Sequence, residues 1–401
     1  MKSDNPFFNE WETPFEVPPF DQIKASHYMP AYLKAFEEQK QEIKAIINNP
    51  GKPDFENTIK PYIYSGELLT KVNRVFSGLN SANTNDTLQE INKEVAPLLS
   101  KHNDDISLND SLFQRVKLVF ENKDKFNLTK EELKILDDTY KDFVRSGAAL
   151  SPENKEKLRK INEELSVLSV RFGQNLLAET NDFKLILDKE EDLSGLPEGV
   201  RAQAASIAKT YGMDGKCVFT LQVPSMTPFL QYSDRRDLRE KLFTAYFMKG
   251  DNDNANDNKK IISRIARLRV ERSQLLGYDT YADFVLERNM AKTPERVIDF
   301  LLQVWNAAIP VAKAEAAAQQ KLITKEGGKF RLQPWDWWYY TEKIRKEKYD
   351  LDDEITRPYF MIDNVMKGMF YVANRLYGLN FSERNDIPKY HPDVVTFEVT
   401  R

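Results

Sequence analysis

Ser151-Pro-Glu-Asn-Lys-Glu-Lys-Leu-Arg-Lys-Ile-Asn-Glu-Glu-Leu-Ser-Val-Leu-Ser-Val-Arg-Phe-Gly-Gln-Asn-Leu176 has the pattern of one long amphipathic helix. Ser151 supplies a hydroxyl N-cap, and Pro152 occupies the first helical position, where its missing N–H is not needed. Apolar side chains then recur three or four residues apart, at Leu158, Ile161, Leu165, Leu168, Phe172 and Leu176. This spacing places them on one face and predicts a helix over about 152–179.

The same periodicity predicts helices on both sides of this stretch. A helical stripe begins near Ile23, and Thr129-Lys-Glu-Glu132 is a capping box that begins another helix. Further helices before residue 150 are predicted at about 55–80, 86–104, 108–122 and 130–146. Those later in the chain are predicted at about 234–248, 255–276, 279–287, 294–325, 335–347 and 358–377. We therefore expect a mainly α fold.

The ends of the helical body are less regular. Residues to about Phe20 are rich in proline and aromatic residues, so we expect an extended arm over 1–22 with its rings packed on the body. A soft boundary near residue 150 separates a helical region, 23–150, from a second one, 151–401. No flexible linker is apparent between them.

Short alternating segments predict a few strands within the helical pattern. Phe183–Leu187 and Cys217–Leu221 are predicted strands that flank a helix at about 197–211, which together form a small α/β insertion over about 181–232. Val394–Val399 is predicted as a last strand, and the sequence offers it no following partner. A terminal strand without a neighbour leaves backbone groups unpaired, so we expect its partner in the next segment of a longer protein.

Composition narrows the classes of function. The chain has 401 residues, of which 41% are hydrophobic, so it can bury a large core. Its 58 basic and 62 acidic residues are interspersed and give a formal charge of −4, which argues against a nucleic-acid partner. No uncharged apolar run approaches ~18 residues, so no membrane span is predicted.

The N-terminus and the single cysteine bear on location. The first residues lack the apolar core of a signal peptide, so we expect a cytoplasmic protein, with the periplasm left open if a signal peptide has been removed. One cysteine, Cys217, excludes an internal disulfide. Because cysteine is among the most buried residue types, we expect Cys217 to be a small buried apolar side chain rather than a reactive thiol.

The histidines provide no metal motif. A gluzincin-type site needs His-Glu-x-x-His on a helix, so that two imidazoles bind zinc and the Glu activates water. His27, His102 and His391 are the histidines of the chain, none is followed by Glu, and no two lie four apart. We therefore assign no catalytic and no metal-ligating residue, and the substrate-binding residues stay unknown.

Two other charged patterns have ordinary interpretations. The run Asp251–Asn258 lacks the glycine and glutamate of a calcium-binding EF-hand loop, so we expect a solvated loop that caps a helix. Four arginines in a predicted helix could bind a carboxylate, but their spacing spreads them around the helix and favours a charged face balanced by Glu271. They are Arg264, Arg267, Arg269 and Arg272.

The densest aromatic cluster lies in Leu332–Asp350. It consists of Trp335, Trp337, Trp338, Tyr339 and Tyr340. Such rings could line a peptide cleft, but large rings more often fill cores, so packing is the favoured interpretation.

Motifs spread along the chain support a family resemblance. They are Asn5-Pro-Phe-Phe8, Leu150-Ser-Pro-Glu153, Phe172-Gly-Gln-Asn-Leu176, Leu275-Leu-Gly-Tyr-Asp-Thr-Tyr-Ala282, Met290-Ala-Lys292, Pro334-Trp-Asp-Trp-Trp-Tyr-Tyr-Thr-Glu-Lys-Ile-Arg345, Arg357-Pro-Tyr-Phe360 and Leu376-Tyr-Gly-Leu379. Together they resemble the N-terminal portion of the bacterial peptidyl-dipeptidases (dipeptidyl carboxypeptidases) of the thimet oligopeptidase family of zinc metallopeptidases. None of these motifs is catalytic in the family.

The resemblance implies a fold and a cofactor. It implies a large multi-helix body of an oligopeptidase-like (zincin-type) fold, incomplete at its C-terminus, in which 151–401 includes the start of the catalytic domain without its zinc motif. Members bind one zinc through His-Glu-x-x-His and a further Glu, and the motif lies beyond the point that matches Arg401. Zinc is thus expected for the full-length family member and none for this chain.

The resemblance also implies a function. Family members release C-terminal dipeptides from short peptides, so the expected partners are short peptides and the missing C-terminal catalytic portion. The chain alone is expected to be inert. Two alternatives stay open, namely a non-catalytic peptide-binding protein and one half of a split enzyme.

Overall fold

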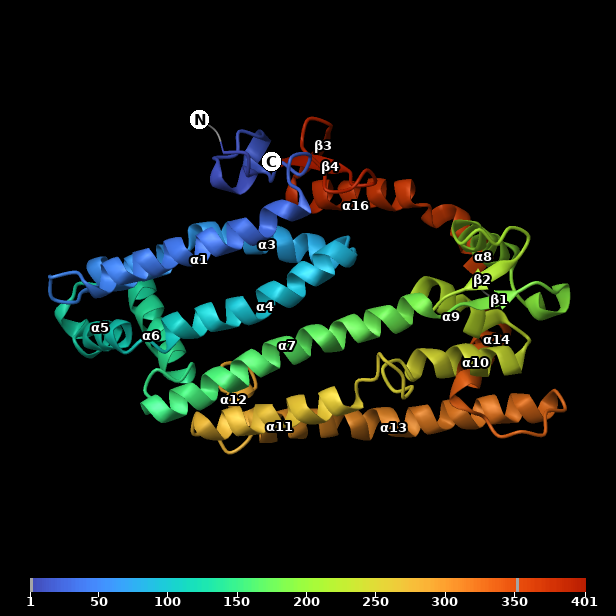
Figure 1. Ribbon diagram of the computed structural model, residues 1–401. Helices are drawn as coiled ribbons and strands as arrows, with labels where there is room; N and C mark the ends of the chain where they lie inside the picture. The colour runs from blue at the N-terminus through green and yellow to red at the C-terminus, as the bar shows by residue number, and fades with distance from the viewer. Residues whose placement is uncertain (1–2, 351–352) are drawn as a thin grey trace. The chain divides into compact units, whose positions relative to one another are not determined.

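The computed structural model describes residues 3–350 and 353–401, and it is mainly α-helical (Figure 1). By internal contacts the chain forms two compact units. Unit 1 consists of residues up to Arg171, Arg264–Phe284 and Leu379–Arg401, and unit 2 consists of Phe172–Ser263 and Val285–Gly378. The sequence suggests a soft boundary near residue 150, whereas these units divide within a continuous helix.

Unit 1 is built from the helices of the N-terminal region. Its elements are α1 (Ala25–Ile47), α2 (Lys60–Tyr64), α3 (Glu67–Ala82), α4 (Asp86–Ser107), α5 (Asp110–Glu121), α6 (Lys130–Arg145) and the first part of α7 (Pro152–Asp182). Most of α11 (Lys259–Leu275) and the start of α12 (Tyr281–Leu286) also belong to it. The long helix that the capped, periodic stretch after Ser151 predicts is therefore confirmed as α7.

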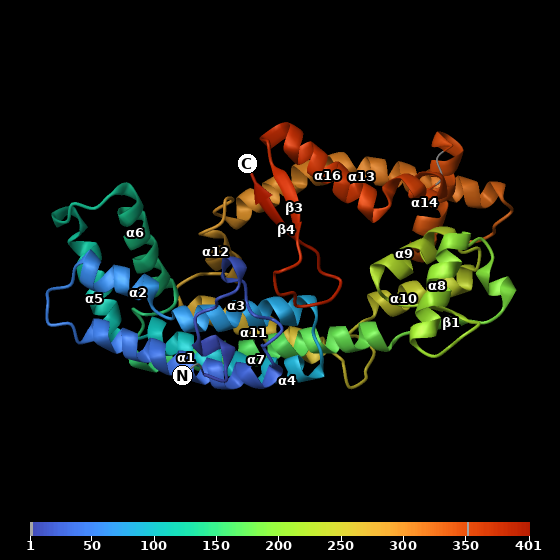
Figure 2. The ribbon, with the colours of Figure 1, turned by 90° about the horizontal axis from the view of Figure 1, so that it is seen from above.

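The helix pair α1 and α3 forms the centre of one core cluster, with α4 beside α1 (Figures 1 and 2). Tyr28, Tyr32 and Phe76 are nearly inaccessible to solvent and pack edge to face. The N-terminal arm reaches this cluster, because Phe7 is buried against Tyr28 with ring centroids 5.4 Å apart. The arm is not extended throughout, since Pro6–Phe8 and Pro14–Glu16 form 3-10 turns.

The single helix predicted over 55–80 is wrong, because the chain breaks it into three pieces. Phe55–Ile59 forms a π-helical turn, α2 follows, and α3 begins only after Gly66. Gly66 has a φ of 75°, a left-handed conformation that glycine adopts without strain. Its N–H donates to the Glu42 carboxylate at 2.7 Å, which fixes the turn against α1.

Unit 2 contains the α/β insertion and the later helices. Its elements are β1 (Leu185–Leu187), α8 (Glu198–Thr210), β2 (Cys217–Phe219), α9 (Val223–Tyr232), α10 (Arg236–Phe247), α13 (Pro294–Lys325), α14 (Trp337–Tyr349), α15 (Asp353–Thr356) and α16 (Ile362–Tyr377). Figure 2 shows β1, α8, α9 and α10 gathered together. The sequence did not predict α9, because Pro224 and Pro228 resemble loop signals; Pro224 in fact lies in the first turn, where a proline is tolerated.

The predicted strands of the insertion are confirmed. β1 and β2 pair antiparallel, with Leu185 opposite Phe219 and Leu187 opposite Cys217. Cys217 is buried and free, as expected, and burial raises the pKa of its thiol. Both strands and α8 to α10 share one apolar cluster, which is the core of this part of unit 2.

The expectation that the last strand lacks a partner in this chain is wrong. β4 (Thr396–Thr400) pairs antiparallel with β3 (Asn380–Arg384), and Asn380 lies opposite Thr400. Arg384 donates to the Glu398 carboxylate at 2.5 Å across this hairpin. β3 was not predicted from the sequence, because Asn380-Phe-Ser-Glu-Arg384 is polar and has only one apolar side chain, the ring of Phe381.

Two helices of unit 2 carry large exposed apolar side chains. On α13, Phe300 and Trp305 are 64% and 60% exposed, and on α16 Tyr371 and Leu376 are 65% and 67% exposed. Within the described part of the chain, α13 is also the helix long and apolar enough to cross a membrane by length and composition, and its apolar window is 0% buried. Charged residues also occur along this helix. That the protein has no membrane partner is a prediction from the sequence.

Candidate functional site

The most distinctive sequence motif forms a buried ionic anchor at the start of α14. Asp336 has no solvent exposure and accepts hydrogen bonds from Arg236 Nε at 3.0 Å and Arg239 Nη2 at 3.0 Å. Arg239 is itself 1% exposed and donates further to the backbone oxygens of Ser233 and Trp335. A buried carboxylate requires such partners, and the anchor ties α10 to the chain before α14.

The aromatic residues after this anchor are mainly packing residues. Tyr339 and Tyr340 are buried, with ring planes perpendicular and centroids 5.1 Å apart. The Tyr339 hydroxyl donates to Asp234 at 2.8 Å, which raises the pKa of Tyr339 together with burial, the larger cause. The interpretation of the cluster as core is therefore confirmed for these two rings.

One apolar recess remains beside the same motif. It has a volume of ≈ 440 Å³ and is lined by Phe243, Phe247, Leu332, Gln333, Pro334, Trp337 and Trp338. Trp337 and Trp338 are only partly buried. Both rings therefore line an apolar recess of unit 2 and keep part of their surface accessible to solvent.

The four arginines of α11 have different surroundings. Arg264 forms a bidentate pair with Glu164, with both N–O distances 2.7 Å. The guanidinium of Arg269 lies over the Tyr281 ring, and Arg267 is exposed. The charged-face interpretation describes these three, whereas Arg272 is partly buried and lines a cavity.

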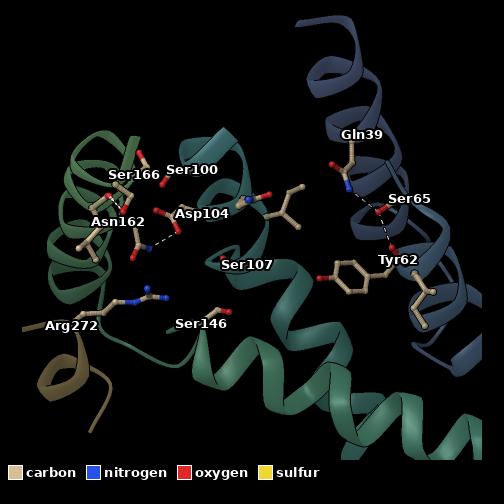
Figure 3. A pocket seen from close by; sticks show the side chains of 15 residues that line it. Gln39, Tyr62, Ser65, Ser100, Asp104, Ser107, Ser146, Asn162, Ser166 and Arg272 are labelled. Carbon is tan, nitrogen blue, oxygen red and sulfur yellow. Dashed lines mark hydrogen bonds between the residues drawn. The ribbon is translucent and has the colours of Figure 1, made fainter. Parts of the chain in front are cut away.

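This cavity is a polar feature of unit 1. It has a volume of ≈ 650 Å³, and its wall is formed by Gln39, Tyr62, Ile63, Ser65, Ser100, Asn103, Asp104, Ile106, Ser107, Ser146, Asn162, Leu165, Ser166, Ser169 and Arg272. In Figure 3, Arg272 extends from α11 into the space near Asn162 and Ser146. The helices α1, α4, α7 and α11 all contribute to the wall, so the tertiary fold of unit 1 creates it.

Asp104 is the buried acid of the cavity. It is 7% exposed, and one of its oxygens accepts a hydrogen bond from Asn162 Nδ2 at 2.8 Å. Burial raises the pKa of Asp104 to about 6, although Asn162 and the charges of Arg159 and Arg272 act in the opposite direction. Asp104 is therefore ionised at neutral pH at a free-energy cost.

A second buried group braces the opposite wall. His102 is 2% exposed, its ring lies against Phe36 with centroids 4.7 Å apart and planes tilted by 34°, and its Nε2 lies 2.7 Å from Gln39 Oε1. Burial lowers the pKa of His102, and Nε2 is the donor in this bond because the amide oxygen of Gln39 can only accept. Gln39 then donates from Nε2 to Ser65 Oγ at 3.3 Å, which orients the amide at the cavity wall (Figure 3).

The histidines do not assemble a metal site within the described ranges 3–350 and 353–401. His27 Nδ1 accepts the Lys24 N–H at the start of α1, and His391 lies beside Asp393 in a turn. Across these ranges no group of three or more His, Cys, Asp or Glu side chains is placed to hold a metal ion. The zinc that the family resemblance implies therefore finds no fitting donor set among these residues.

The acidic loop after α10 is organised by a lysine. Lys259 Nζ lies 2.8 Å from Asp251 and Asp253 and 2.9 Å from Asp257, so an ammonium occupies the position where a cation would collect these carboxylates. Buried Glu179 accepts hydrogen bonds from the Gly250 N–H and the Asn252 and Asn254 side chains. The interpretation as a structural loop rather than a calcium site agrees with these contacts.

Sequence reasoning missed Asp104 and undervalued Arg272. Asp104 lies in Asn103-Asp-Asp105 on an ordinary amphipathic helix, where nothing distinguishes it from the many other carboxylates of the chain. Arg272 differs from its three neighbours only in the direction it takes from α11. A buried acid on one helix and a half-buried base on another, more than one hundred residues later, meet only after folding.

Comparisons with known proteins agree with the motifs. Residues 229–401 match the family model of peptidase family M3. The dipeptidyl carboxypeptidases of Escherichia coli (strain K12) and Salmonella typhimurium (strain LT2) are 38% and 36% identical over 400 and 398 residues, which is 100% and 99% of this chain. Oligopeptidase A of Escherichia coli is 32% identical over 391 residues, or 96% of the chain.

The alignments also give the share of each relative that this chain spans. It covers 59% and 58% of the two dipeptidyl carboxypeptidases and 57% of oligopeptidase A. The chain thus spans less than two thirds of the length of the relatives it matches.

Proposed function

Because the chain belongs to peptidase family M3, we propose that it is the N-terminal portion of a zinc-dependent peptidyl-dipeptidase that removes C-terminal dipeptides from short peptides. The observation that carries this proposal is the identity to the dipeptidyl carboxypeptidases, which extends over essentially the whole chain and exceeds that to oligopeptidase A. The proposed location is the cytoplasm, and the proposed ligands are short peptides.

The chain alone is proposed to be catalytically inert. Zinc would activate the attacking water in the complete enzyme, and it requires three protein ligands with suitable geometry. The described residues provide no such group, so we assign no catalytic step to any of them. Their proposed roles are to build the helical framework and, through the recess beside Trp337 and Trp338, to contact peptide side chains.

The test is a dipeptide-release assay on the purified chain. An N-blocked tetrapeptide is incubated with the chain and added zinc, with and without a chelator, and the Escherichia coli relative serves as the active control. We expect no dipeptide release from the chain and chelator-sensitive release from the control. Chelator-sensitive release by the chain itself would contradict the proposed inertness.

A split enzyme is the second candidate, and the exposed apolar faces of α13 and α16 support it. In that case a separate polypeptide covers these faces and supplies the metal ligands. Mixing the chain with the part of the Escherichia coli relative that lies beyond the aligned region should then restore dipeptide release. The peptide-binding alternative instead predicts that tetrapeptides bind the chain with a measurable heat. It also predicts that neither the chain alone nor the mixture releases a dipeptide.

A further inference from the structure

We propose that the polar cavity of unit 1 binds a small zwitterion of the amino-acid type, a free α-amino acid or a dipeptide, with its carboxylate on Arg272 and its ammonium on Asp104. The proposal depends on side chains of unit 1 and on no peptidase activity. It therefore stands or falls separately from the function proposed above.

Arg272 presents a cation that its protein surroundings leave incompletely satisfied. Its Nε is buried and has no hydrogen-bond partner among the described residues. Its guanidinium lies 5.5 Å from the centre of the Phe284 ring, an interaction that supplies no anionic oxygen. Burial lowers the pKa of Arg272, yet a guanidinium stays charged at neutral pH, so an anion entering the cavity would gain a charge-assisted hydrogen bond.

The nearest acid, Asp104, leaves Arg272 available to a ligand carboxylate. Asp104 and Arg272 are close enough to influence each other electrostatically, but the hydrogen bond that Asp104 accepts comes from the neutral amide of Asn162. The neighbouring Asp105 is already paired with Arg159 at 2.7 Å. One carboxylate and one guanidinium are thus held on different helices around the same space, without a direct hydrogen bond between them.

This pair of charges selects the class of ligand. Arg272 would attract a simple anion, but Asp104 would repel it. Asp104 would attract a simple cation, but Arg272 would repel it. A molecule with both a carboxylate and an ammonium satisfies both charges, and each buried group that it pairs loses part of its desolvation cost. The positive charge of Arg145 adds to that of Arg272, which places the ligand carboxylate at that end.

The remaining wall suits the polar backbone of such a ligand. Ser100, Ser107, Ser146 and Ser166 line the cavity together with Gln39 and Asn162 (Figure 3). These groups both donate and accept hydrogen bonds, as amide and carboxylate groups require. The volume of ≈ 650 Å³ lies within the range of small-molecule sites and admits a dipeptide.

The experiment is isothermal titration calorimetry of the intact chain at pH 7.5 with four ligands. L-alanine and L-alanyl-L-alanine compare the two members of the class. N-acetyl-L-alanyl-L-alanine removes the ammonium, and L-alanyl-L-alanine amide removes the carboxylate. We expect saturable binding of at least one zwitterion and at least tenfold weaker binding of both blocked peptides; the stronger of alanine and dialanine identifies the ligand.

Variants locate the binding in the cavity. Arg272→Gln should weaken the zwitterion at least tenfold and abolish the preference for the free acid over the amide. Asp104→Asn should abolish the preference for the free amine over the acetylated peptide. Arg267→Gln is the matched control, because Arg267 is exposed on the same helix and should leave affinity unchanged.

A further variant guards against loss of folding. Ser166 lies on α7 at the cavity wall, so Ser166→Leu should fill space and block binding while keeping an intact helix by circular dichroism. Absence of heat with every ligand at millimolar concentration overturns the proposal. Equal weakening by Arg267→Gln and Arg272→Gln, or full binding by Ser166→Leu, overturns it as well.

Discussion

The burial of one carboxylate, that of Asp104, lowers the stability of the folded chain at neutral pH. Its carboxyl is 7% exposed, and its pKa rises to about 6 from an ordinary value of 3.8 because of burial. The folded chain therefore holds this proton more tightly than the unfolded chain. Between these two pKa values, stability falls as pH rises, and the loss is complete above the folded pKa.

This sign gives the first prediction. Asp104→Asn removes the buried charge, so the variant should be more stable than the parent at pH 7.5 by up to about 3 kcal/mol, from ~1.4 kcal/mol per pKa unit. Urea unfolding at pH 4.5 and pH 7.5 measures it, and the gain should shrink at the lower pH. The control is Asp105→Asn, which loses the ion pair with Arg159 and should not stabilise. A less stable Asp104→Asn variant at pH 7.5 would contradict the assigned cost.

Asp336 predicts the opposite behaviour, because its charge is matched. Asp336→Asn would leave Arg239 buried without its carboxylate, and breaking one side of a buried pair typically costs about 3–5 kcal/mol. The urea unfolding midpoint should fall accordingly. Arg236→Gln is the control, because Arg236 is 32% exposed and its loss should cost less. A loss below ~1 kcal/mol for Asp336→Asn would show that the anchor contributes little.

At the residue scale, the sequence was informative about composition and packing. It did not show which side chains lie close together in the folded chain. It identified Cys217 as buried and Tyr339 and Tyr340 as core residues, because these follow from residue type and local pattern. It could not find Asp104 and Arg272 as neighbours, because six other α-helices, α5 to α10, lie between α4 and α11 along the chain.

At the scale of elements, long periodic helices were predicted closely and exceptions followed backbone chemistry. The predicted bounds of α13, 294–325, coincide with the observed Pro294–Lys325. The errors occurred where proline or glycine changes the local rule, at α9 and at the break before α3, and where a strand is polar, at β3. The turn at Gly66 and the strand β3 also depend on partners elsewhere in the sequence, which are Glu42 and β4.

The exposed apolar faces of α13 and α16 give a prediction for the isolated chain. Side chains such as Phe300 and Trp305 leave apolar surface in water, which favours association. The double variant Phe300→Glu and Trp305→Lys should reduce the mass measured by light scattering at high concentration. Gln303→Glu adds a charge at an exposed polar position of the same helix and should leave the mass unchanged. A parent chain that is monomeric over the whole concentration range would contradict the prediction.

At the scale of the molecule, the two units share continuous helices. Both α7 and α11 begin in one unit and end in the other, and the division within α7 falls between Arg171 and Phe172. Gly173 lies just beyond it, exposed, with open space around the position of a Cβ atom. An interior helical glycine weakens the helix, because it gains more backbone freedom on unfolding than any other residue.

Replacement of this glycine tests whether the shared helix limits stability. Gly173→Ala should raise the free energy of unfolding by about 0.5–1 kcal/mol, measured by urea unfolding, because the methyl group meets no neighbour. Gly378→Ala is the contrasting variant, because Gly378 ends α16 with a φ of 70° and should lose stability on substitution. Destabilisation by Gly173→Ala would mean that the helix needs its flexibility there.

The terminal hairpin has a consequence for synthesis on the ribosome. β3 and β4 belong to unit 1, although the residues immediately before them, Val285–Gly378, belong to unit 2. A chain that emerges from its N-terminus first therefore exposes an unfinished unit 1 while all of unit 2 is translated. Unit 2 has its full set of residues once Gly378 has emerged, and unit 1 receives the β3–β4 hairpin only after that point. Unit 1, whose residues are made first, is thus completed after unit 2. This order lengthens the time during which a nascent chain needs protection by chaperones.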